Sequence, residues 1–382
     1  MNRRRFLAAS AMAAAAGRSG LAHGERKTNR RWLLVGTQTH KDSKGIYAYN
    51  WDPATGELTG EMLAAVSDNP TFLALDPVAN YLYAANELDN FQGQKSGAVS
   101  AFAVDVAGHK LRPINQVASL GSGTCNVSVD HIGRAAFCAN YVGGSASSFY
   151  LHPDGQISDA VSHFQYTGHG PNPERQEGPH AHRVTVSPDN RWLLVNDLGL
   201  DEIHVYHLDP TNAKLTPNQP PAWQATPGSG PRALRFHPNG HIAYCVCEMG
   251  SVVNVLHWDT QKGILHELQT LSLVPEDYHG ETAGCDIVLT RDARFAYAIN
   301  RFYDCVVTFA VAKDGKLTLL TRSSCGGKVP RDLTLDPTER WLLVANQESD
   351  NIGVFARDAK TGKLAETGKS YPRVKPQCLV FA

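Results

Sequence analysis

The sequence lacks an excess of charge of either sign, and it lacks low-complexity segments. Its 382 residues include 36 Lys and Arg against 37 Asp and Glu, which gives a net charge of −1 with the two signs interspersed. Proteins that bind nucleic acid or anionic membranes usually present a basic patch or stripe. The charge pattern therefore argues against both partners. No linker or charge block divides the chain, and we expect a single domain over residues 30–382.

The chain also lacks the cysteine spacings of haem and zinc sites. None of its eight cysteines lies in a Cys-x-x-Cys-His motif or in paired Cys-x-x-Cys motifs. Most of them occupy predicted apolar strands, where cysteine behaves as a small hydrophobe. We therefore expect free thiols, with one or two chance bridges left open. The strand cysteines are Cys125, Cys285, Cys378, Cys138, Cys245 and Cys247.

The N-terminus has an apolar stretch that is too short to anchor the chain in a bilayer. The segment Asn2-Arg-Arg-Arg-Phe-Leu7 resembles a twin-arginine export signal, and small apolar residues follow over 8–16. A permanent anchor needs about 20 apolar residues. We expect residues 1–22 to be a removed signal, no membrane anchor after its removal, and a periplasmic or secreted protein. Cleavage near Ala16, or a basic tail that stays attached, are the alternatives.

What the chain does contain is one segment that recurs seven times, about fifty residues apart. The clearest copy, residues 329–346, has a short apolar strand, an Asp-Pro turn and a second apolar strand that ends at Asn. A third strand usually follows, as in residues 351–355. Repeats of this length with several short strands are typical of β-propeller blades. The other copies begin near Pro70, Cys125, His180, Pro231, Cys285 and Pro376.

The incomplete last copy predicts how the ring closes. Residues 376–381 supply a first strand only, whereas residues 31–35 match the second strand at 340–344, and residues 45–49 supply a third. We therefore predict an all-β fold, a seven-bladed β-propeller whose C-terminal strand pairs with N-terminal strands. Such pairing removes the open sheet edges that invite aggregation.

The repeat also predicts which side chains meet at one mouth of the central channel. The first and second strands of a blade are antiparallel, so the start of the first lies beside the end of the second. The residues at the starts of the first strands are Thr71, Cys125, His182, Arg232, Cys285, Arg331 and Gln377. The residues at the ends of the second strands are Gln38, Glu87, Tyr141, Asp197, Glu248, Arg301 and Gln347.

These two sets differ from blade to blade and include many ionisable groups, whereas a purely structural repeat would place similar residues at equivalent positions. Asp286 and Asp332 lie one residue further inside, and His180 lies two residues before His182. Mixed charges in a concave, partly desolvated mouth shift pKa values and bind small polar ligands. The alternative is a water-filled channel held by salt bridges between blades.

Several segments resemble the seven-bladed lactonase family, which includes propeller-type 6-phosphogluconolactonases and carboxymuconate-lactonising cyclases. The similarity covers nearly all of the mature chain. Its most specific part is the Pro-His-x-His pattern within residues 175–182, together with Pro-Arg at 231–232 and the downstream Glu248. The Ala-Asn strand ends are less specific, because non-enzymatic propellers share them.

The resemblance implies a His, an Arg, a Glu and a second Arg as catalytic groups. Lactone hydrolysis needs a base that activates water and a donor for the developing oxyanion, and it needs no cofactor. Glu248 or a histidine can take the proton, and the arginines can hold the oxyanion or a substrate anion. Carried over by motif, the catalytic groups fall on His180 or His182, Arg232, Glu248 and Arg301. Further predicted substrate contacts are Glu87, Tyr141, Arg331, Gln347 and Asp286.

No metal site is expected, because the His-x-His pair has no evident third ligand. The expected partner is a small-molecule lactone, and a monomer is expected by analogy with other propellers. A phosphorylated cytoplasmic lactone would not normally reach an exported enzyme, so an unphosphorylated aldonolactone is an alternative substrate. Two other functions stay open. One is a muconate-type cycloisomerase acting on a dicarboxylate, and the other is a non-enzymatic binding or scaffold propeller with structural rim charges.

Overall fold

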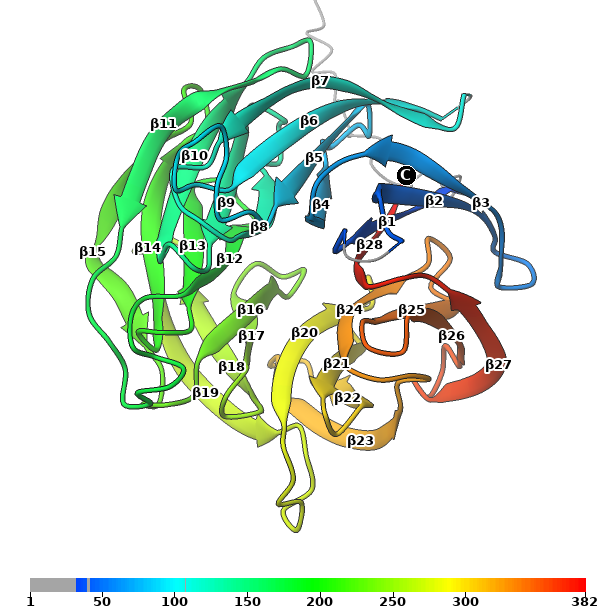
Figure 1. Ribbon diagram of the computed structural model, residues 1–382. Helices are drawn as coiled ribbons and strands as arrows, with labels where there is room; N and C mark the ends of the chain where they lie inside the picture. Colours follow the sequence, from blue (N-terminus) through cyan, green and yellow to red (C-terminus); the bar gives the residue numbers. More distant parts are fainter. Residues whose placement is uncertain (1–31, 40–41, 107) are drawn as a thin grey trace, which may run out of the picture.

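The protein is a ring of seven four-stranded antiparallel sheets (Figure 1). The computed structural model describes residues 32–39, 42–106 and 108–382, and the regular elements in them are all β-strands. Each sheet is one blade, with its first strand nearest the axis. The predicted all-β, seven-bladed propeller is therefore confirmed, whereas the expected export signal, residues 1–22, lies outside the described residues. No helix in the described part of the chain is long and apolar enough to cross a membrane.

The two inner layers of the ring carry the apolar strands of the repeat. The innermost strands are β4 (Pro70–Leu75), β8 (Thr124–Val129), β12 (Ala181–Val186), β16 (Pro231–Phe236), β20 (Ala283–Leu289), β24 (Pro330–Leu335) and β28 (Pro376–Phe381). The second strands are β1 (Trp32–Thr37), β5 (Tyr81–Asn86), β9 (Ala135–Asn140), β13 (Trp192–Asp197), β17 (Ile242–Cys247), β21 (Phe295–Arg301) and β25 (Trp341–Asn346).

The two outer layers complete each blade. The third strands are β2 (Gly45–Asp52), β6 (Ala98–Asp105), β10 (Ser145–Leu151), β14 (Glu202–Asp209), β18 (Val252–Asp259), β22 (Cys305–Val311) and β26 (Asn351–Arg357). The outermost strands are β3 (Glu57–Val66), β7 (Lys110–Ala118), β11 (Ile157–Gln165), β15 (Lys214–Gln224), β19 (Ile264–Ser272), β23 (Leu317–Ser324) and β27 (Leu364–Pro372).

The ring closes as the incomplete last repeat predicts. Strand β28 pairs antiparallel with β1, with Leu33 opposite Phe381, and the sheet continues through β2 to β3. Figure 1 shows the red C-terminal strand beside the blue β1. The last strand thus supplies the hydrogen-bond partners that β1 would otherwise lack at the centre of the ring.

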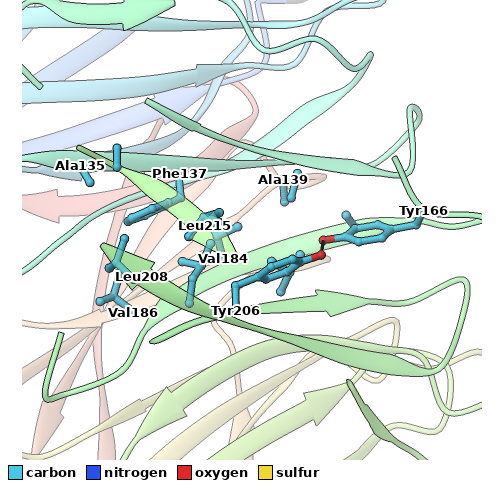
Figure 2. Packing of buried hydrophobic residues seen from close by; sticks show 14 residues of the cluster. Ala135, Phe137, Ala139, Tyr166, Val184, Val186, Tyr206, Leu208 and Leu215 are labelled. Atoms are coloured by element: carbon cyan, nitrogen blue, oxygen red, sulfur yellow. Dashed lines mark hydrogen bonds between the residues drawn. The ribbon is translucent and has the colours of Figure 1, made fainter. Parts of the chain in front are cut away.

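The core consists of seven hydrophobic clusters, one between each pair of neighbouring blades. In Figure 2, Phe137 of β9 packs against Val184 of β12 and Leu208 of β14. The hydroxyls of Tyr166 and Tyr206 are hydrogen-bonded at 3.0 Å in the same cluster. Side chains alternate across a strand, and each blade has a neighbour on both faces. This is why the second strands read as continuous apolar runs rather than as alternating patterns.

The asparagine at or next to the end of most second strands has a structural role. Asn86, Asn140 and Asn346 are fully buried. Their side-chain amides donate to backbone carbonyls of the segment that leads into the blade, as from Asn140 Nδ2 to Ser119 O at 3.2 Å and from Asn346 Nδ2 to Cys325 O at 3.1 Å. The Ala-Asn motif therefore has a structural role, which is to hold the segment that leads into each blade.

All eight cysteines are free and buried, which confirms the expectation of free thiols. Burial raises the pKa of the Cys125 thiol to about 12, with a smaller contribution from the Glu87 carboxylate. A thiol in such a setting is neutral and behaves as a small apolar group.

Candidate active site at the channel mouth

A β-bulge interrupts the start of every innermost strand. In β4, Pro70 lies opposite Asn86 and Phe72 lies opposite Ala85, so Thr71 has no partner in the ladder. A bulge re-aims the side chain of the extra residue. The unpaired residues include the whole first set predicted from the repeat, which we call the mouth ring: Thr71, Cys125, His182, Arg232, Cys285, Arg331 and Gln377. In β20 the next residue, Asp286, is unpaired as well.

The mouth ring encloses a small cavity on the axis. Its volume is about 20 Å³, which is room for about one water molecule. Six of the seven ring residues line it, together with residues that follow them in the innermost strands. The lining residues are Thr71, Phe72, Cys125, Asn126, His182, Arg183, Arg232, Asp286, Arg331 and Gln377.

The second predicted set lies beside the mouth ring at the same rim. In most blades, the backbone N–H of the residue at the end of the second strand donates to a carbonyl two residues before the ring residue. Examples are Glu87 N to Asn69 O at 2.9 Å and Glu248 N to Gly230 O at 2.8 Å. The predicted placement of the two sets is thus what the structure shows.

Three arginines converge on the carboxylate of Glu248, which follows β17. Arg232 Nε and Arg301 Nη2 lie 2.9 and 2.6 Å from Glu248 Oε2. Arg175 Nη2 lies 2.6 Å from Oε1 and 3.4 Å from the Tyr141 hydroxyl. The Glu248 side chain is only 5% exposed. Burial opposes its charge, but Arg301, Arg232 and Arg175 outweigh burial and lower its pKa to about 2.

The two histidines of the Pro-His-x-His pattern have different surroundings, because the bulge at His182 turns it to the axis. His180 lies just before β12, and its ring stacks on Tyr141 with centroids 4.5 Å apart. His180 Nδ1 lies 3.0 Å from the Tyr141 carbonyl oxygen, and Nε2 lies 3.2 Å from Glu177 Oε1. The carbonyl can only accept, so Nδ1 carries a proton. Glu177 Oε1 is also an acceptor, so Nε2 is available to take a proton only when Glu177 turns away.

His182 is buried within the mouth ring, and its ring meets the edge of Tyr141 with centroids 5.5 Å apart. Burial, followed by the charges of Arg232, Arg331 and Arg183, lowers its pKa well below the usual value of 6.5. His182 is therefore a neutral polar group at neutral pH and a weak base.

One layer below the mouth ring, a buried network crosses the channel. Arg183 of β12 forms a close ion pair with Asp286 of β20, and its guanidinium lies 4.8 Å from the centre of the Phe72 ring. Arg183 and Arg235 outweigh burial and lower the pKa of Asp286. Asp332 has the opposite shift, because burial and the neighbouring Asp286 charge raise its pKa to about 7. Arg183 and Asp286 also line the small cavity, so this network forms part of its wall.

Several polar groups of the mouth lack some or all of their possible partners in the described structure. Arg331 Nε donates to Gln377 Oε1 at 3.1 Å, but no carboxylate among the described residues pairs with its guanidinium. The buried atoms Thr71 Oγ1, Glu87 Oε2 and Gln377 Nε2 lack hydrogen-bond partners in the described part of the chain. Buried polar atoms are usually paired, so these groups are suited to bind a polar ligand.

Two other predicted rim residues make local contacts instead. Gln347 Nε2 donates to Glu348 Oε1 at 3.1 Å, on the exposed side of the rim. Asp197 Oδ1 accepts the backbone N–H groups of His180, Gly199 and Leu200 at 2.8 to 3.1 Å. Asp197 therefore fixes the segment that carries His180.

The strand-based reasoning did not assign roles to three residues that the structure brings to the site. Arg175 and Glu177 lie in the connection between β11 and β12, which is longer than the corresponding connections of the other blades. The one sequence feature that points to Arg175 and Glu177 is their position within residues 175–182, the segment that also contains the two histidines. Arg183 directly follows the mouth-ring residue His182. Its contact with Asp286 across the axis exists only because the blades close into a ring. Within the described residues, no group of three His, Cys, Asp or Glu side chains is placed to hold a metal ion.

Comparison with known proteins places the whole ring in one family. Residues 32–381 match the family described as lactonase, 7-bladed beta-propeller. The 6-phosphogluconolactonase of Bacillus subtilis is 34% identical over 348 residues, which cover 91% of this chain and 97% of that protein. The periplasmic gluconolactonase of Pseudomonas aeruginosa has a similar structure, with a TM-score of 0.86 at 34% identity, over 92% of this chain and 98% of that one.

Proposed function

The chain belongs to the seven-bladed β-propeller lactonase family, and we propose that it is a hydrolase that opens a sugar lactone at the channel mouth. Its relatives of 34% identity include a 6-phosphogluconolactonase and a periplasmic gluconolactonase. The reaction adds water across the ring ester. The carbonyl carbon gains a hydroxyl, the ring C–O bond breaks, and the ring oxygen takes a proton to leave an open-chain acid.

The observation that carries this proposal is the pair of buried guanidinium groups held by Glu248. Negative charge develops on the lactone carbonyl oxygen when water attacks, and fixed N–H donors in a desolvated site stabilise it. Arg232 and Arg301 remain charged at any working pH, and their contacts with Glu248 Oε2 fix their orientation. We propose that they bind the oxyanion. Glu248, with a pKa of about 2, is a weak base and positions the two arginines.

His180 is the base in this scheme. The Tyr141 carbonyl holds the proton on Nδ1, which leaves Nε2 to take a proton from the attacking water and return it to the ring oxygen. Glu177, whose side chain is 60% exposed, can turn into solvent and free Nε2. His182 stays neutral and would contact the substrate as a hydrogen-bonding group.

The remaining predicted substrate contacts fall into groups according to whether their side chains are already paired with other residues. Glu87, Tyr141 and Arg331 have free polar atoms or surfaces at the mouth, and we propose that they bind substrate hydroxyl or anionic groups. Gln347 would act at the outer edge of the rim. Asp286 is tied to Arg183, and we propose that it forms the floor beneath the substrate.

The location of the protein bears on its substrate. We propose export by the twin-arginine route to the periplasm. This is supported by the sequence Asn2-Arg-Arg-Arg-Phe-Leu7 and by the periplasmic source stated for the Pseudomonas aeruginosa neighbour. In that compartment an unphosphorylated sugar lactone is one candidate substrate, and the 6-phosphate of gluconolactone is the other.

The test is the initial rate of acid release from glucono-δ-lactone and from its 6-phosphate, with a buffer blank because these lactones open spontaneously. The wild type is compared with His180→Gln and with the matched control His241→Gln, which changes an exposed histidine on the opposite rim. Removal of a general base lowers kcat by about 10²–10⁴-fold. We expect such a loss for His180→Gln and no change for His241→Gln.

Two results would contradict this scheme. Full activity in folded His180→Gln would exclude His180 as the base. No acceleration over the blank by the folded wild type would exclude hydrolysis of these lactones. Turnover of a muconate-type dicarboxylate would then indicate a cycloisomerase, and the absence of turnover on all three compounds would favour a binding propeller.

A further inference from the structure

The cavity inside the mouth ring is too small in this structure to hold a sugar lactone. The cavity inside the mouth ring measures about 20 Å³, whereas pockets for small ligands typically measure about 300–1,000 Å³. A lactone therefore cannot enter this cavity, which Arg232 lines, until some neighbouring group moves.

Arg175 is the group best placed to move. Its side chain is 45% exposed, whereas the Glu248 side chain that it covers is 5% exposed. Its guanidinium is held through Nη2 alone, by Glu248 Oε1 and by the Tyr141 hydroxyl. Arg232 and Arg301 hold the other carboxylate oxygen from below. Arg175 can thus leave without exposing an unpaired buried charge.

Only the Arg175 side chain has to turn, because the backbone of its connection is fixed. Gln176 is fully buried. Its Oε1 accepts the backbone N–H of Asn172 at 3.2 Å, and its Nε2 donates to the Leu198 carbonyl at 2.9 Å. The connection itself, residues 166–180, is the longest between strands of the described ring.

A cleft of ligand size is lined by residues next to this ion pair in the sequence. It has a volume of about 420 Å³, within the usual range for small-molecule sites. Glu174 and Met249 line it, and these residues are the sequence neighbours of Arg175 and Glu248. The other lining residues are Pro171, Asn172, Pro173 and Gly228. The cleft therefore lies close to the Arg175–Glu248 pair.

We propose that Arg175 is a gate that also determines substrate specificity. It closes the mouth by pairing with Glu248, and it turns toward the cleft when a carboxylate or phosphate of the substrate replaces Glu248 as its partner. This inference rests on the proposed lactonase function. A neutral lactone offers Arg175 no such partner and has to displace it without compensation. The enzyme should therefore prefer anionic lactones, and the preference should depend on Arg175.

The test compares three lactones: neutral glucono-δ-lactone, its 6-phosphate, and a glucaric acid lactone that carries a carboxylate. The variants are Arg175→Gln and the matched control Arg191→Gln. Arg191 is 48% exposed and pairs with Asp189 at 2.8 Å on the opposite rim. Loss of one charge-assisted contact weakens binding about tenfold. We expect KM for one or both anionic lactones to rise about tenfold in Arg175→Gln, with KM for the neutral lactone unchanged or lower.

Equal changes of KM for all three lactones, or no change for any, would overturn the gate. The larger effect among the two anionic lactones identifies phosphate or carboxylate as the natural group. Arg191→Gln should leave every KM unchanged.

A binding measurement keeps the gate testable if the wild type hydrolyses none of these compounds and the proposed function fails. Calorimetry with gluconate 6-phosphate, glucarate and gluconate reports binding without turnover. The gate predicts that Arg175→Gln weakens binding of at least one of the two acids with a second anionic group more than it weakens binding of gluconate, whose single carboxylate is the one formed by ring opening. Equal affinities in the wild type and the variant, or no binding of any acid to the wild type, would overturn it.

Discussion

Replacement of Glu248 by Gln should destabilise the ring as well as impair the site. In the folded protein the Glu248 pKa falls from 4.5 to about 2. One pKa unit corresponds to about 1.4 kcal/mol, so the ionised carboxylate contributes about 3 kcal/mol to the free energy of unfolding. The same order, about 3–5 kcal/mol, is typical when one partner of a buried ion pair is removed and its counter-charges stay behind.

The pH dependence of this loss follows from the direction of the shift. A lowered pKa means that the folded state favours the ionised form, so the contribution is fully present above the unfolded pKa near 4.5 and is lost as pH falls through about 2. The stability difference between the wild type and Glu248→Gln should be about 3 kcal/mol at pH 7 and less than half of that at pH 3.

Urea unfolding followed by tryptophan fluorescence at pH 7, 5, 4 and 3 measures this difference. Glu348→Gln is the matched control, because Glu348 is exposed and pairs with Lys375 at 2.7 Å. Exposed ion pairs contribute about 0–1 kcal/mol. A loss below about 1 kcal/mol for Glu248→Gln at pH 7, or a loss that does not change with pH, would refute the view that Glu248 stabilises the three arginines as a carboxylate.

Three further predictions concern the channel floor, the thiols and the closure of the ring. Asp332 has a raised pKa of about 7, so its stabilising contribution is lost as pH rises from about 4 through 7. Asp332→Asn, which keeps an acceptor for the Leu379 N–H, should gain Tm relative to the wild type between pH 5 and 8, and an equal Tm difference at both pH values would contradict this. Ellman's reagent should label none of the eight buried cysteines in the native protein and all of them in urea; rapid native labelling would show that the thiols are accessible. Removal of residues 376–382 should prevent formation of a compact species in gel filtration, because β1 then lacks its partner strand, and a truncated protein that elutes as the intact ring does would refute this account of closure.

The sequence was sufficient for the fold because each blade repeats the same local pattern. The Asp-Pro turn and terminal Asn give a fixed point in every copy, and counting from it locates the mouth ring, from Thr71 to Gln377, without knowledge of the bulges. The bulges themselves were not predicted, because they appear only in the pairing of two strands and leave no residue type in common. The ring residues share a position, not a side chain.

The parts of the site that escaped prediction are those that the repeat does not control. Arg175 lies in a connection that is longer than its counterparts in the other blades, so alignment of the copies gives no information about it. Arg183 and Asp286 are 103 residues apart, and their contact depends on two side chains crossing the axis. The choice between Glu248 and a histidine as base stayed open for the same reason. The pKa of Glu248 is set by arginines from three separate segments.

The bulges also have a consequence for how this architecture diversifies. Each places one residue of the mouth ring outside the hydrogen-bond ladder, and so outside the pattern that holds the blades together. Mutations at these positions can change the chemistry of the mouth while the 28 strands and their interfaces keep their packing. The seven mouth-ring positions can thus vary separately while the packing of the blades stays the same. Evolution or a protein engineer can alter the substrate range of such a ring one blade at a time.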